Sequence, residues 1–311
     1  MITIGNVSVE RGQKKTGFLK AGEFSDGSPI NVPLILVNGV KDGPTLWIGC
    51  CIHGNEVAGT YALLKTIKEI DPKSLSGKII GVPAINITAF WTGGRIPIFD
   101  TKDLNRIMPG NPDGSFAEQY ASVIYKTAKE NADYLIDVHW AGTVDWALFN
   151  GDVEIAEKAK EFAKSSGFEV IVCDPDAHGG VLNGGLFTVM ARHGIPSVIL
   201  ESKNIEKLHI AYTNFLKHLK MIEGKPVVSA EQKLYNGFAW GDIVIKRGGL
   251  FHKMVEEGEQ VSKGQTIGIM TDIFGEEVEK ILSTVDGLVM LGPDNKPLNM
   301  GTKPFEIAIN I

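Results

Sequence analysis

The sequence has no long hydrophobic segment and little cysteine. No apolar run approaches the roughly 20 residues that cross a bilayer, and the N-terminus lacks the charged-then-apolar layout of a signal peptide. The three cysteines, Cys50, Cys51 and Cys173, are odd in number and are interpreted as small buried hydrophobes. A zinc-ligand role for Cys51 is the alternative. We therefore predict a cytoplasmic protein without a membrane partner.

An excess of basic residues is also absent. The formal net charge is −6, with 43% hydrophobic and 22% charged residues. Such a composition describes a globular protein without the electrostatic footprint of a nucleic-acid partner. The length of 311 residues accommodates one large domain and a small one.

Two histidines and one glutamate carry the strongest indication of chemistry. His53 and Glu56 follow the apolar run 45–52, and their spacing puts both side chains on one face of a helical turn. His139 closes a second apolar strand, and open α/β sheets place their sites beyond the carboxyl ends of strands. Two imidazoles and one carboxylate are a recurring ligand set for catalytic zinc. The alternatives are a solvated helix start for His53 and Glu56 and a structural role for His139.

A third apolar run, 196–201, ends at Glu201. A carboxylate beside a metal-activated water can accept its proton and pass it to a leaving nitrogen, so Glu201 is the predicted general base. The alternative is a glutamate that caps the helix expected to begin near Asn204.

Four motifs in this order resemble the succinylglutamate desuccinylase/aspartoacylase family, a branch of the zinc carboxypeptidase-like hydrolases, over roughly residues 30–220. They are His53-Gly54-Asn55-Glu56, Asp103-Leu104-Asn105-Arg106, Asp137-Val138-His139 and Leu200-Glu201. The resemblance implies a mixed sheet flanked by helices, with one zinc ion at the strand ends. It implies His53, Glu56 and His139 as ligands, Asn105 and Arg106 as binders of a substrate carboxylate, and Glu201 as the catalytic carboxylate.

The stretch 86–115 is rich in glycine and proline and is predicted to be an irregular binding loop. Arg106 suits the role of anchor, because a planar guanidinium holds a carboxylate bidentately. The resemblance further implies that Arg95 polarises the scissile carbonyl and stabilises the oxyanion. A surface arginine is the alternative for Arg95.

Apolar strand-like segments alternate with helical patterns along the first two thirds of the chain. Strands are expected near 34–38, 45–52, 78–85, 134–139, 168–173 and 196–201, and helices near 56–70, 116–131, 152–166 and 205–222. This alternation predicts an α/β fold. Residues 1–225 are therefore expected to form the hydrolase domain.

From about residue 238 the pattern changes to short alternating strands separated by small turns. Residues 226–311 are expected to form a small all-β module that resembles the barrel-sandwich fold of biotinyl and lipoyl carrier domains. The stretch 270–275, where those domains carry a modified lysine, contains none. We therefore expect no covalent cofactor and interpret the module as a structural cap, a wall of the active site or a contact in a homo-oligomer.

These features together predict a zinc-dependent hydrolase that cleaves the amide bond of an N-acyl amino acid or a similar small carboxylate-bearing substrate. A metallocarboxypeptidase acting on short peptides would use the same ligand set, and so would an ester hydrolase. A non-catalytic protein that binds zinc or a partner through its β module is the non-enzymatic alternative.

Overall fold

The computed structural model describes residues 1–180 and 182–310, which divide into two compact units. The larger unit comprises Met1–Trp140, Asp145–Ile171 and Asp176–Gln232. The smaller unit comprises Ala141–Val144, Val172–Pro175 and Lys233–Ile311. Among the described residues, no helix combines the length and the apolar character that a membrane span requires.

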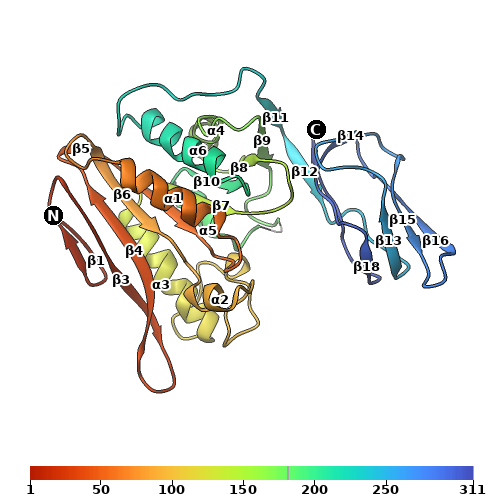
Figure 1. Ribbon diagram of the computed structural model, residues 1–311, viewed down its shortest axis with the longest axis horizontal. Coiled ribbons are helices and arrows are strands. Elements are labelled where there is room, and N and C mark those ends of the chain that lie inside the picture. The colour runs from red at the N-terminus through yellow and green to blue at the C-terminus, as the bar shows by residue number, and fades with distance from the viewer. Residues whose placement is uncertain (181, 311) are drawn as a thin grey trace. The chain divides into compact units, whose positions relative to one another are not determined.

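A nine-stranded mixed sheet, in the order β11-β9-β8-β10-β7-β5-β6-β4-β3, organises the α/β fold (Figure 1). Its central strands β6, β5, β7 and β10 run parallel, whereas β3, β4 and β8 pair antiparallel with their neighbours. The strands span Gln13–Glu23 (β3), Pro29–Asn38 (β4), Lys41–Cys50 (β5), Ser76–Val82 (β6), Tyr134–His139 (β7), Trp146–Asn150 (β8), Val170–Asp174 (β9), Ser197–Glu201 (β10) and Lys233–Tyr235 (β11). The mixed sheet confirms the predicted fold class.

The central strands are apolar because helices cover both of their faces. All six residues from Thr45 to Cys50 are buried, as expected of parallel strands inside a sheet. On one face Phe162 of α4 lies 4.5 Å, between ring centroids, from Phe215 of α6, and α6 also packs against α1. On the other face α5 packs against β7 and β10, behind the sheet in Figure 1 together with α3. The helices span Ala58–Glu69 (α1), Ile87–Thr92 (α2), Phe116–Asn131 (α3), Ala156–Lys164 (α4), Leu186–Arg192 (α5) and Ile205–His218 (α6).

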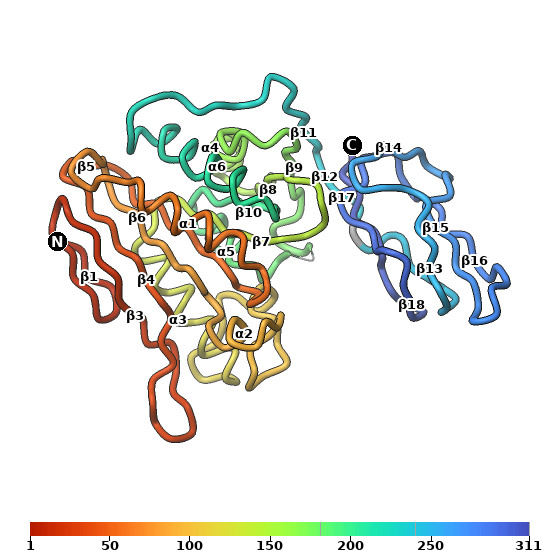
Figure 2. Tube along the Cα trace, in the orientation of Figure 1, coloured from red at the N-terminus to blue at the C-terminus, as the bar shows by residue number. Residues whose placement is uncertain are grey.

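The sequence did not predict several of these elements. The N-terminal strands β1 (Ile2–Ile4), β2 (Val7–Val9) and β3, the short strand β8 and the helix α5 were not expected. The stretch 86–115 is also less irregular than predicted, since it contains α2 and a 3₁₀ turn, η1 (Leu104–Arg106). The trace in Figure 2 shows β3 and β4 as one long hairpin, whose outer strand is largely exposed.

The smaller unit contains two four-stranded antiparallel sheets, in the orders β12-β19-β17-β14 and β16-β15-β13-β18. A core that includes Phe251, Ile267 and Phe305 fills it. In the described part of the chain neither sheet closes into a barrel, so the structure supports an all-β module without the predicted barrel. The strands span Gly237–Trp240 (β12), Gly249–Lys253 (β13), Gln260–Val261 (β14), Thr266–Thr271 (β15), Glu277–Leu282 (β16), Gly287–Leu291 (β17), Lys296–Leu298 (β18) and Glu306–Ile309 (β19).

The segment Ala141–Val144, which follows β7 in the chain, belongs to this smaller unit. One oxygen of the Glu257 carboxylate accepts hydrogen bonds from the backbone N–H and the hydroxyl of Thr143. Its other oxygen accepts from the backbone N–H of Gly292 at 3.2 Å. Gly142 has a φ of 64°, and a Cβ there would lie 2.8 Å from the carbonyl oxygen of Met290. The segment is therefore held tightly within the unit.

Candidate metal centre and active site

Several predicted site residues lie at or just after the carboxyl ends of three neighbouring parallel strands, β5, β7 and β10. β7 ends at His139 and β10 ends at Glu201, and these two residues are register partners. β5 ends at Cys50, three residues before His53. Because register partners on adjacent strands lie about 5 Å apart and their side chains share a face of the sheet, Glu201 and His139 belong to one site. The structure thus brings together strand ends that are far apart in sequence.

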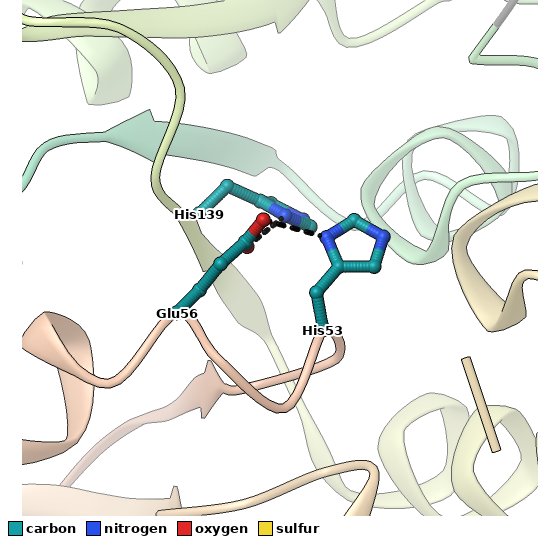
Figure 3. A group of neighbouring side chains, drawn as sticks. All are labelled: His53, Glu56 and His139. Carbon is teal, nitrogen blue, oxygen red and sulfur yellow. Dashed lines mark hydrogen bonds and ion pairs between the residues drawn. The ribbon is translucent and has the colours of Figure 1, made fainter. Parts of the chain in front are cut away.

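His53, Glu56 and His139 converge on a common point and are all buried (Figure 3). The Nδ1 atom of His53 lies 2.9 Å from Oε1 of Glu56, and Nδ1 of His139 lies 3.0 Å from Oε2. The three ligand atoms lie within 4.8 Å of one another. Two imidazole nitrogens and a carboxylate oxygen are a donor set that suits Zn²⁺, so these residues fit the expected metal.

The outer nitrogen of each imidazole faces a carboxylate. Nε2 of His53 lies 3.2 Å from Oδ1 of Asp103, and Nε2 of His139 lies 3.3 Å from Oδ2 of Asp137. Metal-ligating histidines commonly donate their other N–H to a carboxylate, which fixes the ring orientation and makes the ligand more basic. Both aspartates thus extend the site, although their roles were not predicted. The spacing of Asp137 and His139, two apart on one strand face, was the available indication.

Asn105 and Arg106 lie in η1, but the structure gives them different surroundings. Asn105 is buried, and its Nδ2 lies 3.3 Å from Nε2 of His139. Its Oδ1 accepts a hydrogen bond from the backbone N–H of Leu186 at 3.3 Å. Asn105 is therefore fixed through its Oδ1, and its Nδ2 lies against the ring of His139. Arg106 is partly buried and donates from Nη1 to the carbonyl oxygen of Asn105 at 2.9 Å.

Arg95 reaches the site through Asp103. Its Nε donates to Oδ2 of Asp103 at 3.0 Å, and its Nη2 lies 2.9 Å from the same oxygen. About half of the Arg95 side chain is exposed, whereas the Asp103 side chain is 18% exposed. Asp103 therefore lies between Arg95 and His53, with Oδ2 facing Arg95 and Oδ1 facing His53.

Glu56 and His139 hold each other in their ionised forms. Burial opposes ionisation of Glu56, but hydrogen bonds and charges from His139 and His53 outweigh it and lower the pKa of Glu56 to about 2. Burial likewise opposes protonation of His139, yet the charges and hydrogen bonds of Asp137 and Glu56 raise its pKa well above the ordinary value. Without a metal, the cluster thus retains a proton that a bound cation would displace.

These shifts predict how the stability of the metal-free protein depends on pH. His139 stabilises the fold below its ordinary pKa of 6.5, and this contribution is lost as the pH rises through the raised value. Glu56 stabilises the fold above its ordinary pKa of 4.5, and its contribution is lost as the pH falls towards 2. We expect the melting temperature of chelator-treated wild-type protein to exceed that of His139→Gln most between pH 4.5 and pH 6.5. The difference between the two melting temperatures should shrink at alkaline pH. A difference that grows from pH 7 to 9 would contradict the assignment.

The sequence of this chain resembles those of known proteins. The succinylglutamate desuccinylase/aspartoacylase catalytic domain model matches residues 42–184. The N-alpha-acetyl-L-2,4-diaminobutyric acid deacetylase of Halomonas elongata is 29% identical, over 94% of this chain and 90% of that protein.

Solved structures share the fold at lower identity. A succinylglutamate desuccinylase/aspartoacylase from Rhodobacter sphaeroides has a TM-score of 0.86 at 22% identity, with 98% of both chains covered. The product-bound ectoine utilization protein EutE from Ruegeria pomeroyi has a TM-score of 0.83 at 22% identity, also with 98% of both covered. The matched catalytic domain contains His53, Glu56 and His139, and the fold is shared along the whole chain. The chain thus resembles the succinylglutamate desuccinylase/aspartoacylase family in its catalytic segment, residues 42–184, and in its fold.

Proposed function

We propose that this protein is a zinc-dependent deacylase that hydrolyses the amide bond of an N-acyl amino acid or a similar small carboxylate-bearing substrate. The observation that carries the proposal is the buried cluster of His53, Glu56 and His139, with Glu201 in register beside His139. The match to the family's catalytic domain and the deacetylase relative support the reaction class.

In this proposal His53, Glu56 and His139 hold one Zn²⁺ ion. Zinc in such a site supplies Lewis acidity and lowers the pKa of a water molecule to about 7. Glu201 accepts a proton from the attacking water and then donates it to the leaving nitrogen. Arg95 stabilises the negative charge that develops on the carbonyl oxygen, which requires its guanidinium to reach past Asp103.

Arg106 is the proposed anchor for a substrate carboxylate, with Asn105 beside it. Since the amide of Asn105 already contacts His139 and Leu186, Asn105 is proposed to orient the metal ligand as well as to border the substrate. The partly buried guanidinium of Arg106 has the planar fork that binds a carboxylate through two hydrogen bonds.

We expect Arg106→Ala to raise KM for carboxylate-bearing substrates by about 10- to 100-fold, with a smaller change in kcat. The reason is that hydrogen bonds to charged groups contribute about 1.5–3 kcal/mol. Steady-state kinetics would measure the change, with the exposed Arg247 in the smaller unit, replaced by alanine, as the control. An unchanged KM for every carboxylate substrate would remove Arg106 from the binding role.

The acyl group and the amino acid are proposed from the relative. N-alpha-acetyl-L-2,4-diaminobutyric acid is the substrate to test first, beside N-acetylaspartate, N-succinylglutamate and short peptides. Amine release by the zinc-loaded protein, lost after chelation and restored by zinc, would support the proposal. Loaded protein that hydrolyses only the peptides, from their C-terminal end, would favour a carboxypeptidase instead.

We also propose that residues 1–225 carry the hydrolase function and that residues 226–311 form an unmodified carrier-like β module in a cytoplasmic protein. The tip of the β15–β16 hairpin supports the absence of a carried cofactor, because it presents Ile273 and Phe274, both strongly exposed, instead of a lysine. Mass spectrometry of the intact protein would test this, since a covalent cofactor would add to the mass of the chain.

A further inference from the structure

The residue after β5 has a backbone conformation that non-glycine residues rarely adopt. Cys51 has a φ of 52°, in the left-handed region, and is fully buried. Such conformations persist where the surrounding structure holds them, and they occur disproportionately at functional sites. At this position the conformation ends the strand and turns the chain towards His53, two residues later.

The thiol of Cys51 closes the turn that it begins. Its Sγ donates to the carbonyl oxygen of Glu56 at 3.4 Å and lies 3.2 Å from Oγ1 of Thr60. The Thr60 hydroxyl itself donates to the carbonyl oxygen of Pro83 at 2.5 Å. Since the threonine proton is already committed, the single thiol proton is shared between Glu56 and Thr60. Cys51 thus links the entry of the turn to the backbone of Glu56.

The outer side of the same turn is also fixed. A Cβ at Gly54 would lie 2.1 Å from the carbonyl carbon of Ala89 in α2, so the turn packs directly on the helix backbone. The backbone N–H of Asn86, which caps α2, donates to the carbonyl oxygen of Cys51 at 3.0 Å. The turn therefore has little freedom on the α2 side, and the Cys51 thiol fixes its remaining end.

We propose that Cys51 is a positioning residue for the metal centre: its left-handed backbone directs His53 into the site, and its thiol fixes the backbone of Glu56. The proposal rests on the proposed function, because it takes His53 and Glu56 as metal ligands. Cys51 is not itself a ligand here, since its sulfur is directed to Glu56 and Thr60 and lies outside the converging group.

The test compares metal affinity in matched cysteine variants of the full chain. Cys51→Ala is expected to weaken Zn²⁺ binding by about 10- to 100-fold, as replacement of outer-shell partners does. Cys51→Ser keeps a donor and should restore most of the affinity. Cys50→Ala is the control, because Cys50 is equally buried on the neighbouring position but its sulfur faces Tyr212 at 3.8 Å. The visible spectrum of bound Co²⁺ should change in Cys51→Ala and stay unchanged in Cys50→Ala.

If Cys51→Ala does not fold, Zn²⁺ affinity can be compared in Thr60→Val and Thr60→Ser instead, because the Thr60 hydroxyl contacts the Cys51 sulfur. Valine removes the hydroxyl that anchors the thiol and should weaken Zn²⁺ binding, whereas serine should retain it. Wild-type affinity and an unchanged Co²⁺ spectrum in Cys51→Ala and Thr60→Val would overturn the positioning role while leaving the metal site intact. A wild-type protein that binds neither Zn²⁺ nor Co²⁺ would instead overturn the proposed function, and the positioning role with it.

Discussion

Replacing His139 by alanine is expected to remove stoichiometric zinc and reduce kcat/KM to background. Catalytic zinc rests on three protein ligands, so the loss of one leaves too few donors to hold the ion. The expected loss of affinity exceeds about 100-fold, because replacing outer-shell partners alone already costs about 10- to 100-fold. Elemental analysis of protein purified without chelator would give the zinc content of each variant.

His252→Ala is the matched control for this experiment. His252 is an exposed histidine in β13 whose Nε2 lies 3.0 Å from the hydroxyl of Thr271. Its replacement is also a change from histidine to alanine, but it leaves His53, Glu56 and His139 unaltered. It should retain about one zinc per chain. If His139→Ala also retained full zinc, the ligand assignment would be wrong, and metal-free wild-type protein that resists reloading would direct attention to the β module as a binding domain.

Replacing Glu201 by glutamine is expected to lower kcat by about 10²- to 10⁴-fold, the usual contribution of a positioned general acid–base group. Glutamine keeps the shape of the side chain but cannot accept the proton. Zinc content should stay at the wild-type level, because Glu201 is not one of the three converging ligands. Single-turnover rates and zinc content measured on the same preparation would separate chemistry from metal loss.

A suitable control is Glu206→Gln in the first turn of α6. Glu206 is exposed and pairs with Lys65, so it tests whether the loss of any nearby carboxylate slows the reaction. Its kcat should equal that of the wild type. Wild-type turnover in zinc-loaded Glu201→Gln would show that another group moves the proton.

The central sheet could be predicted because burial on both faces leaves long apolar runs in β5, β7 and β10. β8 was not expected, although its five residues, Trp146–Asn150, are all buried. The helix α5 lacks an amphipathic stripe, since six of its seven residues are buried. The outer strand β3 is largely exposed and polar, so neither burial nor alternation marks it.

The candidate metal cluster was accessible from sequence because strands of an α/β sheet present their carboxyl ends along one edge. The orientation of each imidazole was not accessible, because it depends on Asp103 and Asp137 approaching particular ring nitrogens. The same limit applies to Asn105, whose amide contacts His139 from a different loop. The left-handed backbone of Cys51 also had no sequence marker, since glycine or asparagine usually occupies such positions.

The discontinuous composition of the smaller unit bears on how this protein can be altered by recombination. A chimera that exchanged only the segment after Gln232 with a relative would separate Thr143 from its own Glu257. Thr143 lies four residues after His139 in the chain. A graft that keeps this contact therefore has to transfer the short inner segment Ala141–Val144 along with the C-terminal strands.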